Sequence, residues 1–378
     1  MMGTQLLLFA SPPPATPAKE QSPPKPVELH AQQAPAALEA TIASGEKGKA
    51  RDIIAAIRTL QQVEHDQRPA TPEERQLLIR FSGFGPVALS IFPNPVTGRY
   101  KDASWQALGE ELRSLLTDEE YASAKRTTPN AFYTSSTVIK AMYQALARLG
   151  VPNTGLVLEP GCGPGRFLYL APKDMRFIGV EMDSISGRIA KALHPKANIR
   201  IENFRDTRLP EIDAAIGNVP FDDLKLEHKS QKFSLHDYFI AKSVDALRPG
   251  GVLAVVTSHY TLDKQNAAIR EYLAERADFV GTIRLPSNAF TREGTHVVTD
   301  ILFLRKRTPG EPAHHADPAW LETAPLDIEG TVVSINRYFH NHPLCAVPHN
   351  GWTQQKSKHR RGNCAASQAS APWCRSLE

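Results

Sequence analysis

The sequence predicts an α/β fold built on a doubly wound parallel sheet of the Rossmann-like type. After Gly155, short apolar segments alternate with stretches of helical periodicity, an order typical of a parallel sheet covered by helices. A glycine-rich turn directly follows the first of these segments, where open α/β sheets bind their ligands. The chain has 378 residues, of which 41% are hydrophobic and 22% charged, so it can bury a large core.

Two regions precede the predicted sheet. Residues 1–45 are rich in proline and alanine and predict a disordered arm, because such a composition cannot build a core. Residues 46–125 predict a helical N-terminal region, in which apolar residues recur at helical spacing. Thr117 and Glu120 have the spacing of a capping box, which predicts a helix start at that point.

The sheet is predicted within residues 126–325. Its strands are expected at residues 155–160, 176–183, 213–221, 250–258, 279–286 and 299–306. Helices are expected around residues 136–149, 183–193, 235–247 and 265–276. The pattern fades after Ala324, and residues 326–378 predict a C-terminal extension that is largely disordered.

Charge and cysteine content exclude several classes of protein. The 44 basic and 40 acidic residues leave a net charge of +4, so a nucleic-acid surface would have to be a local patch. Four scattered cysteines are too few for a disulfide framework and fit a reducing cytoplasm. The apolar start is too short to span a bilayer, so we expect a soluble cytoplasmic protein without a membrane partner.

The glycine-rich turn has the features of a nucleotide-cofactor site. It contains Glu159, Pro160, Gly161, Gly163 and Gly165. Glycines let the backbone approach a ligand closely, and the acidic residue before them suits a cationic cofactor better than a pyrophosphate. Glu181 ends the next strand, where a carboxylate can accept hydrogen bonds from both hydroxyls of a ribose. The alternative is a glycine turn that binds no ligand.

A second motif ends the strand predicted at residues 213–221. The strand runs into Asn218, Val219, Pro220 and Phe221, whereas a strand that merely turns needs only Asn and Gly. The proline and the ring therefore require an explanation beyond the turn itself. On its own, the stretch is equally compatible with an ordinary strand-ending turn.

Together these motifs resemble the S-adenosylmethionine-dependent methyltransferases that methylate the exocyclic amine of adenine in DNA. The turn at residues 159–165 resembles their cofactor motif, and the Asn-Val-Pro-Phe stretch resembles their signature of Asp, Asn or Ser, two prolines and an aromatic residue. Residues 130–136 and 284–306 are similar to two further regions of the modification subunits of restriction systems. The resemblance covers residues 125–307 in the order of the family.

More specifically, the sequence resembles very large methyltransferase–helicase proteins of phages and mobile elements, some of them linked to antirestriction. Residues 58–85 and 335–343 carry this resemblance. In those proteins a helicase part follows about where this sequence loses its pattern. The resemblance implies DNA as a partner, together with a specificity or helicase partner or a helicase part missing from this chain.

The resemblance also implies S-adenosylmethionine as the cofactor. In the family, the segment that matches Phe132, Tyr133 and Thr134 closes over the methionine end of the cofactor. An acidic-aromatic pair that contacts the cofactor adenine matches Asn203 and Phe204, with asparagine in place of the acid. A buried core phenylalanine is the alternative interpretation of Phe204.

The same resemblance assigns the chemistry to the Asn-Val-Pro-Phe stretch. The side-chain carbonyl of Asn218 and the backbone carbonyl of Val219 would each accept one hydrogen of the target amine, and Pro220 would stiffen the turn. Phe221 would hold an adenine flipped out of the duplex. Phe290 would help to hold it, unless that ring belongs to the core. Val219 departs from the first proline of the family, which uses the backbone carbonyl at that position.

Two alternative functions stay open in the sequence. Enzymes with the same fold and motif also methylate RNA bases and the glutamine amide of protein substrates. A catalytically decayed, DNA-binding antirestriction component is the other alternative, and Val219 is the feature that favours it. No metal site is predicted, because His340, His342 and Cys345 with Cys364 and Cys374 match no closed zinc set. His236 and Asp237 are not expected to form a catalytic pair.

Overall fold

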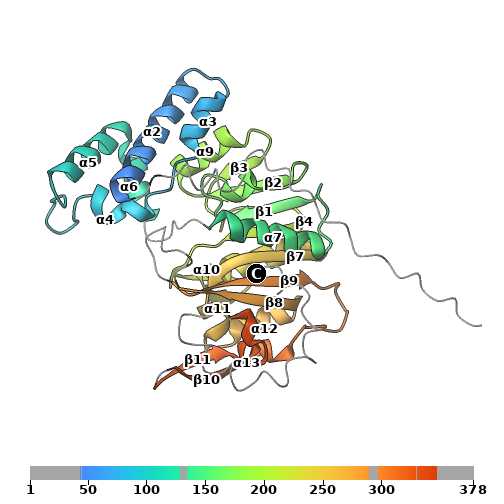
Figure 1. Ribbon diagram of the computed structural model, residues 1–378. Helices are drawn as coiled ribbons and strands as arrows, with labels where there is room; N and C mark the ends of the chain where they lie inside the picture. Colours follow the sequence, from blue (N-terminus) through green and yellow to red (C-terminus); the bar gives the residue numbers. More distant parts are fainter. Residues whose placement is uncertain are drawn as a thin grey trace, which may run out of the picture.

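A computed structural model describes residues 43, 45–127, 134–287, 289, 297–328 and 330–346 of the chain. Its sheet consists of β1 (Leu156–Pro160), β2 (Arg176–Glu181), β3 (Asn198–Ile201), β4 (Ile212–Asn218), β7 (Leu247–Ser258), β8 (Ala277–Leu285) and β9 (Thr299–Lys306). The strand order is β3-β2-β1-β4-β7-β9-β8 (Figure 1). β9 pairs antiparallel with β7 and β8, and the other pairs are parallel. The predicted doubly wound α/β fold is confirmed.

The strand order reverses between β1 and β4. The chain moves outward from β1 to β2 and β3 on one side, then returns to β4 and continues to β7 on the other. In such sheets, ligands bind outside the carboxyl ends of the strands at this switch point. β1 ends at Pro160 and β4 ends at Asn218, so the glycine-rich turn and the Asn-Val-Pro-Phe stretch leave the sheet from neighbouring strands.

Helices cover both faces of the sheet. They are α7 (Ser136–Arg148), α8 (Arg166–Tyr169), α9 (Ser184–Leu193), α10 (Leu235–Ala246), α11 (Tyr260–Asp263) and α12 (Ala268–Ala274). Alternate residues of β7 face opposite sides: Leu253 and Val255 join the core with α10 and α12, and Ala254 and Val256 join the core with α7. All four are fully buried, as expected for a central strand covered on both faces.

The N-terminal helices pack on the sheet domain through α9. They are α2 (Glu46–His65), α3 (Pro72–Leu78), α4 (Ala88–Ile91), α5 (Ala103–Leu115) and α6 (Asp118–Thr127), with a short 3-10 helix η1 (Gly85–Val87). Their core takes in Ile185, Ile189 and Leu193 of α9. Arg188 on the same helix pairs with carboxylates of α2 and α6. The predicted capping box is confirmed, because Thr117 and Glu120 exchange two hydrogen bonds, of 2.9 and 3.2 Å.

The structure differs from the sequence-based expectation at residues 326–346. A hairpin of β10 (Thr323–Ile328) and β11 (Thr331–Asn336) runs across the expected boundary, between the short helices η3 (Pro318–Leu321) and α13 (Arg337–Asn341), and η4 (Pro343–Cys345) follows. Trp320 stacks on Phe279 of β8 with ring centroids 4.8 Å apart, and Tyr338 meets Phe279 edge-on at 5.0 Å. These aromatic residues follow no regular period, so periodicity did not reveal that they complete the core beside β8.

A second hairpin, which the sequence did not predict, lies between Phe221 and α10. It consists of β5 (Lys225–His228) and β6 (Gln231–Ser234). Lys229 and Ser230 connect the strands with φ of 47° and 67°, the left-handed geometry of tight hairpin turns. None of the helices in the described ranges is long and apolar enough to cross a bilayer.

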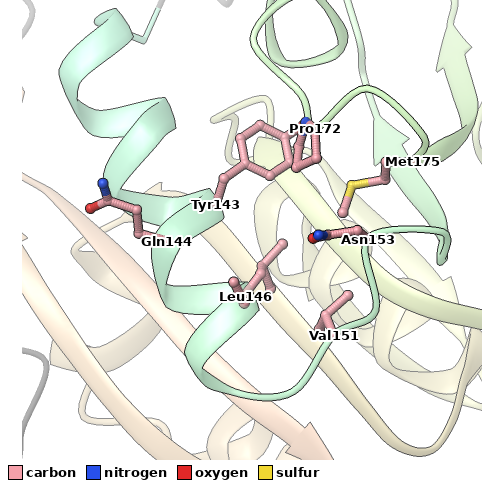
Figure 2. A pocket seen from close by; sticks show the side chains of 8 residues that line it. Tyr143, Gln144, Leu146, Val151, Asn153, Pro172 and Met175 are labelled. Carbon is pink, nitrogen blue, oxygen red and sulfur yellow. The ribbon is translucent and has the colours of Figure 1, made fainter. Parts of the chain in front are cut away.

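A small cavity lies at the amino ends of the strands, away from the switch point. Figure 2 shows Tyr143 and Leu146 of α7 facing Asn153, Pro172 and Met175 around it. Its volume of about 10 Å³ leaves room for about one water molecule. The segments that carry Asn153 and Met175 lead into β1 and β2, so this cavity is at the edge opposite to the one where ligands bind.

Candidate active site

The glycine-rich turn and the Asn-Val-Pro-Phe stretch lie close together at the carboxyl ends of β1 and β4. A Cβ atom placed on Gly161 would lie 3.5 Å from Cδ of Pro220. A Cβ atom placed on Gly217 would lie 3.3 Å from Cγ of Glu159. The backbone at Gly161 and Gly217 therefore leaves space for little more than one methyl group before Pro220 and Glu159, respectively. Two motifs that are separate in the sequence form one site.

The three glycines of the turn have different surroundings. Gly161, Gly163 and Gly165 have φ of 71°, 53° and 83°, which glycine adopts without steric cost. A Cβ atom on Gly165 would lie 2.6 Å from Cδ2 of His194, so glycine is needed there for packing against the end of α9. A Cβ atom on Gly163 would meet nothing within 4 Å. Gly163 is therefore the glycine with open space beside it, as a ligand requires.

Glu159 is a buried carboxyl group beside this turn. It is 3% exposed, and its Oε2 has no hydrogen-bond partner among the residues that the structure describes. Burial, and then repulsion from Glu181, raises the pKa of Glu159 well above its usual value. A buried polar atom without a partner is costly, so the site favours a ligand that brings a hydrogen-bond donor or a positive charge.

Glu181 holds the turn from the end of β2. Its carboxylate accepts hydrogen bonds from the backbone N–H groups of Gly163 and Asp183, both at 2.8 Å. Burial, together with repulsion from Asp183, raises the pKa of Glu181 to about 7, although the two backbone bonds favour the charged form. Each carboxylate oxygen keeps a second lone pair, which can accept from a ribose hydroxyl.

Thr134 adds a second buried acceptor next to α7. It is 2% exposed, and no described residue lies within hydrogen-bond distance of its Oγ1. Thr134 thus has, like Glu159, a buried polar atom that a bound molecule can satisfy. Phe132 and Tyr133, which were predicted with Thr134, lie outside the described residues, as does Phe290.

Asn203 and Phe204 lie just after β3. The side-chain oxygen of Asn203 accepts from the backbone N–H of Arg205 at 2.9 Å, which closes a local turn. Phe204 is 3% exposed and packs on Phe239 of α10 with ring centroids 4.6 Å apart. Lys242 lies 5.0 Å from the centre of the Phe204 ring. This packing supports the alternative interpretation of Phe204 as a core residue.

The Asn-Val-Pro-Phe stretch is fixed to the sheet and to α10. The N–H of Val219 donates to the carbonyl oxygen of Val256 in β7 at 3.1 Å, and the Val219 side chain is buried in the core. The ring of Phe221 is partly buried and meets the His236 ring edge-on, with centroids 6.4 Å apart and planes at 90°. Asn218 is the last residue of β4 and is partly buried.

A buried polar network lies behind this stretch. Ser234 Oγ donates to Asp237 Oδ2 at 2.6 Å and accepts from Lys264 Nζ at 2.9 Å. Lys264 Nζ also lies 3.0 Å from Asp237 Oδ2, and Thr261 Oγ1 donates to Asp237 Oδ1 at 3.0 Å. Ser234 stands at the N-cap of α10, where serine usually caps the helix, but its side chain makes no cap bond. The sequence therefore gave no sign of the network.

The network fixes the protonation of His236. Ser234 has one hydroxyl hydrogen, which goes to Asp237, so at 3.0 Å its oxygen can only accept from His236 Nε2. His236 then carries its hydrogen on Nε2, and Nδ1 is an acceptor without a partner among the described residues. Burial lowers the pKa of His236, which agrees with a neutral ring. His236 thus acts as a rigid neighbour of Phe221 and not as a proton donor to Asp237.

Breaking the charge pair in this network should cost much stability. Lys264→Met leaves the Asp237 carboxylate buried without its cation, which we expect to lower the free energy of unfolding by about 3 kcal/mol. Lys229→Met is the matched control, because the Lys229 side chain is 56% exposed beside Asp245 and surface pairs contribute less than about 1 kcal/mol. Urea unfolding of both variants measures the difference. Equal losses would show that the Lys264 pair behaves as a surface pair.

The described residues offer no metal site, and the thiol in the glycine-rich turn is not reactive. No group of three or more His, Cys, Asp or Glu side chains among them could hold a metal ion. Cys364 and Cys374 lie outside the described part of the chain. Burial, and then the charges of Glu159 and Glu181, raises the pKa of the Cys162 thiol well above its usual value, which makes it a poor nucleophile.

Comparison with known proteins points to one family. A family model described as N-6 DNA methylase matches residues 107–317, more than half of the chain. The Defense against restriction protein B of Escherichia phage P1 is 28% identical over 239 residues, which cover 61% of this chain and 10% of that protein. The matched residues therefore span only about a tenth of the length of that relative.

Two solved structures of restriction-system proteins also align with the chain. The type I restriction-modification system methyltransferase subunit from Streptococcus thermophilus shows 16% identity and a TM-score of 0.41, over 81% of this chain and 75% of that one. The M protein of the type I restriction enzyme EcoKI shows 18% identity and a TM-score of 0.37, over 73% of this chain and 66% of that one. With both scores below 0.5, the fold assignment rests on the strand order described above.

Proposed function

The chain belongs to the N-6 DNA methylase family, and on this premise we propose that it transfers a methyl group from S-adenosylmethionine to the exocyclic amine of adenine in DNA. The closeness of the turn at Gly161 to the proline of the Asn-Val-Pro-Phe stretch supports this proposal. In the proposal, the cofactor lies beside the carbonyl groups of Asn218 and Val219. Proximity of this kind is what an in-line transfer between two bound molecules needs.

The cofactor half of the site uses the acidic residues. S-adenosylmethionine, when bound, supplies a methyl group on a positively charged sulfur. The Glu181 carboxylate accepts hydrogen bonds from the ribose hydroxyls. It uses the lone pairs that are not engaged by the backbone N–H groups of Gly163 and Asp183. Glu159 and Thr134 offer buried acceptors, and the open space beside Gly163 admits the ligand. The negative potential of the two glutamates favours a cation.

The acceptor half of the site uses the Asn-Val-Pro-Phe stretch. The exocyclic amine of adenine is a weak nucleophile, since its lone pair is delocalised into the ring. The side-chain carbonyl of Asn218 and the backbone carbonyl of Val219 each accept one amine hydrogen. These two hydrogen bonds strengthen as positive charge develops on the nitrogen. The methylated amine then loses one proton to solvent. Phe221 stacks on the base, which is flipped out of the duplex at a cost of a few kcal/mol.

Val219 is compatible with activity because the backbone is held in another way. A proline at this position could not donate a hydrogen bond. The N–H of Val219 donates to Val256 at 3.1 Å, so a ladder bond replaces the stiffness of the missing ring. The carbonyl group that the proposed chemistry needs belongs to the backbone and is the same for valine and proline. This argues against decay of the site, the alternative suggested by the antirestriction name of the phage relative.

The molecule that receives the methyl group distinguishes the proposal from its alternatives, in which the substrate is RNA or a protein glutamine. The purified protein, given S-adenosylmethionine with a labelled methyl group, should label duplex or single-stranded DNA, and digestion should release N6-methyladenine. Matched RNA and glutamine-containing peptides are the controls. If only RNA or only the peptide were labelled, DNA would not be the substrate, and that molecule would take its place in the proposal. No label in any acceptor, with cofactor binding intact, would support a binding protein that works with a specificity or helicase partner.

A further inference from the structure

The chain that follows β7 presents an aromatic pair beside the proposed active site. β7 pairs with β4 so that Val256 lies opposite Asn218, and the pair His259 and Tyr260 comes three and four residues later. The two rings are tilted by 35° with centroids 4.0 Å apart. Tyr260 is 54% exposed, and every other phenylalanine, tyrosine or tryptophan side chain in the described ranges is buried or partly buried.

The His259 ring is held by hydrogen bonding, and the Tyr260 ring packs on it. The backbone N–H and Nδ1 of His259 both lie within hydrogen-bond distance of the carbonyl oxygen of Val298, at 3.4 and 3.2 Å. A carbonyl oxygen only accepts, so Nδ1 carries the hydrogen and the ring orientation is set. The N–H of Tyr260 donates to Ser258 Oγ at 3.3 Å. A ring that is already ordered loses little conformational entropy when a ligand stacks on it.

The buried network connects this pair to the Asn-Val-Pro-Phe stretch. Phe221 meets His236 edge-on, and His236 shares Ser234 with Asp237. Asp237 accepts from Thr261, the residue after Tyr260. Phe221 and Tyr260 are therefore anchored to the two ends of one network. Both rings follow neighbouring parallel strands, so both stand at the carboxyl edge of the sheet.

We propose that Tyr260, backed by His259, is a second base-stacking residue of this site and binds an unpaired nucleobase of the DNA substrate next to the flipped adenine. The proposal rests on the proposed function, because it takes DNA as the substrate. A flipped adenine leaves its neighbours without their stacking partner, and an exposed, preorganised ring can replace it. Every base has a π face, so this contact supplies affinity and position without reading sequence.

Tyr260→Ala should weaken binding of a fluorescein-labelled single-stranded DNA oligonucleotide by ~10-fold or more, measured by anisotropy with cofactor present. Tyr260→Phe keeps the ring and should bind as wild type does. Val332→Ala is the control for loss of an exposed apolar side chain, since Val332 is 68% exposed on the β10–β11 hairpin. In turnover, KM for DNA should rise in Tyr260→Ala while cofactor affinity stays unchanged.

A fluorescence measurement gives direct evidence of stacking. Trp105 and Trp320 are buried, and Trp352 and Trp373 lie outside the described residues, so wild type supplies the background emission. The additional emission of Tyr260→Trp over wild type should be quenched by the oligonucleotide. Unchanged DNA affinity in Tyr260→Ala, or no quenching in Tyr260→Trp, would overturn the stacking role while wild-type methylation of DNA still upheld the proposed function. A wild-type protein that binds DNA through Tyr260 but transfers no methyl group would instead uphold the stacking role alone.

Discussion

Replacing Asn218 by alanine should slow methyl transfer by ~100-fold or more, by analogy with deletion of one preorganised polar group from other active sites. The side-chain carbonyl of Asn218 is proposed to stabilise positive charge that exists on the amine only in the transition state. Its loss therefore lowers kcat far more than it changes KM for DNA. Affinity for S-adenosylmethionine should stay near wild type, because the acidic residues that bind it belong to β1 and β2.

The matched control for this variant is Asn153→Ala. Asn153 is exposed and lies at the amino edge of the sheet, beside the small cavity of Figure 2, so its replacement should leave kcat unchanged. Single-turnover measurements with saturating DNA separate the chemical step from product release. An Asn218→Ala protein that is folded and methylates at the wild-type rate would move the chemistry away from the Asn-Val-Pro-Phe stretch.

The parts of the site that depend on local sequence were predictable. Glycines with positive φ and a carboxylate at the end of the next strand leave a pattern of residue types at short spacing, and the structure places Gly161, Gly163 and Glu181 around one turn. The closeness of this turn to Pro220 follows from the strand order, because parallel strands that flank the switch point end at the same edge.

The parts that depend on contacts between distant residues were not predictable. Ser234 and Asp237 look like the cap and first turn of a helix, and only the packing of Lys264 against them reveals a buried charge pair. α9 is buried on two sides, with Ala190 in a core of the sheet and Ile189 in the core of the N-terminal helices. A helix that is buried on two sides does not show one apolar and one polar face. The sequence therefore gave no indication that the N-terminal helices pack against α9.

Binding of S-adenosylmethionine should become tighter as pH rises from about 6 to about 8 and level off above that range. Burial raises the pKa of Glu181 to about 7, so without cofactor this carboxyl group holds its proton in part of the molecules near neutral pH, and burial also raises the pKa of Glu159 well above its usual value. A cationic cofactor with ribose hydroxyls is bound better by the charged forms. Calorimetry in buffers of different ionisation enthalpy should therefore detect proton release on binding.

Variants of Glu181 test which group is responsible. Glu181→Ala removes two charge-assisted hydrogen bonds of ~1.5–3 kcal/mol each and should weaken cofactor binding by ~100-fold or more. Glu181→Gln keeps the shape of the side chain and one acceptor oxygen but cannot titrate. Its affinity should be lower than that of wild type at pH 8 and should vary less with pH near 7. Unchanged cofactor affinity in Glu181→Ala would mean that the cofactor site is misplaced.

The same carboxyl groups should make the stability of the cofactor-free protein fall with pH. In the folded chain Glu181 keeps its proton up to about pH 7, whereas in the unfolded chain it loses it near its ordinary value of 4.5. The resulting stabilisation is fully present below about pH 4.5 and is lost as pH rises through about 7. Bound cofactor stabilises the charged forms, so the difference in Tm between protein with and without cofactor should widen from pH 6 to pH 8. A constant difference would show that neither Glu159 nor Glu181 changes its charge when the cofactor binds.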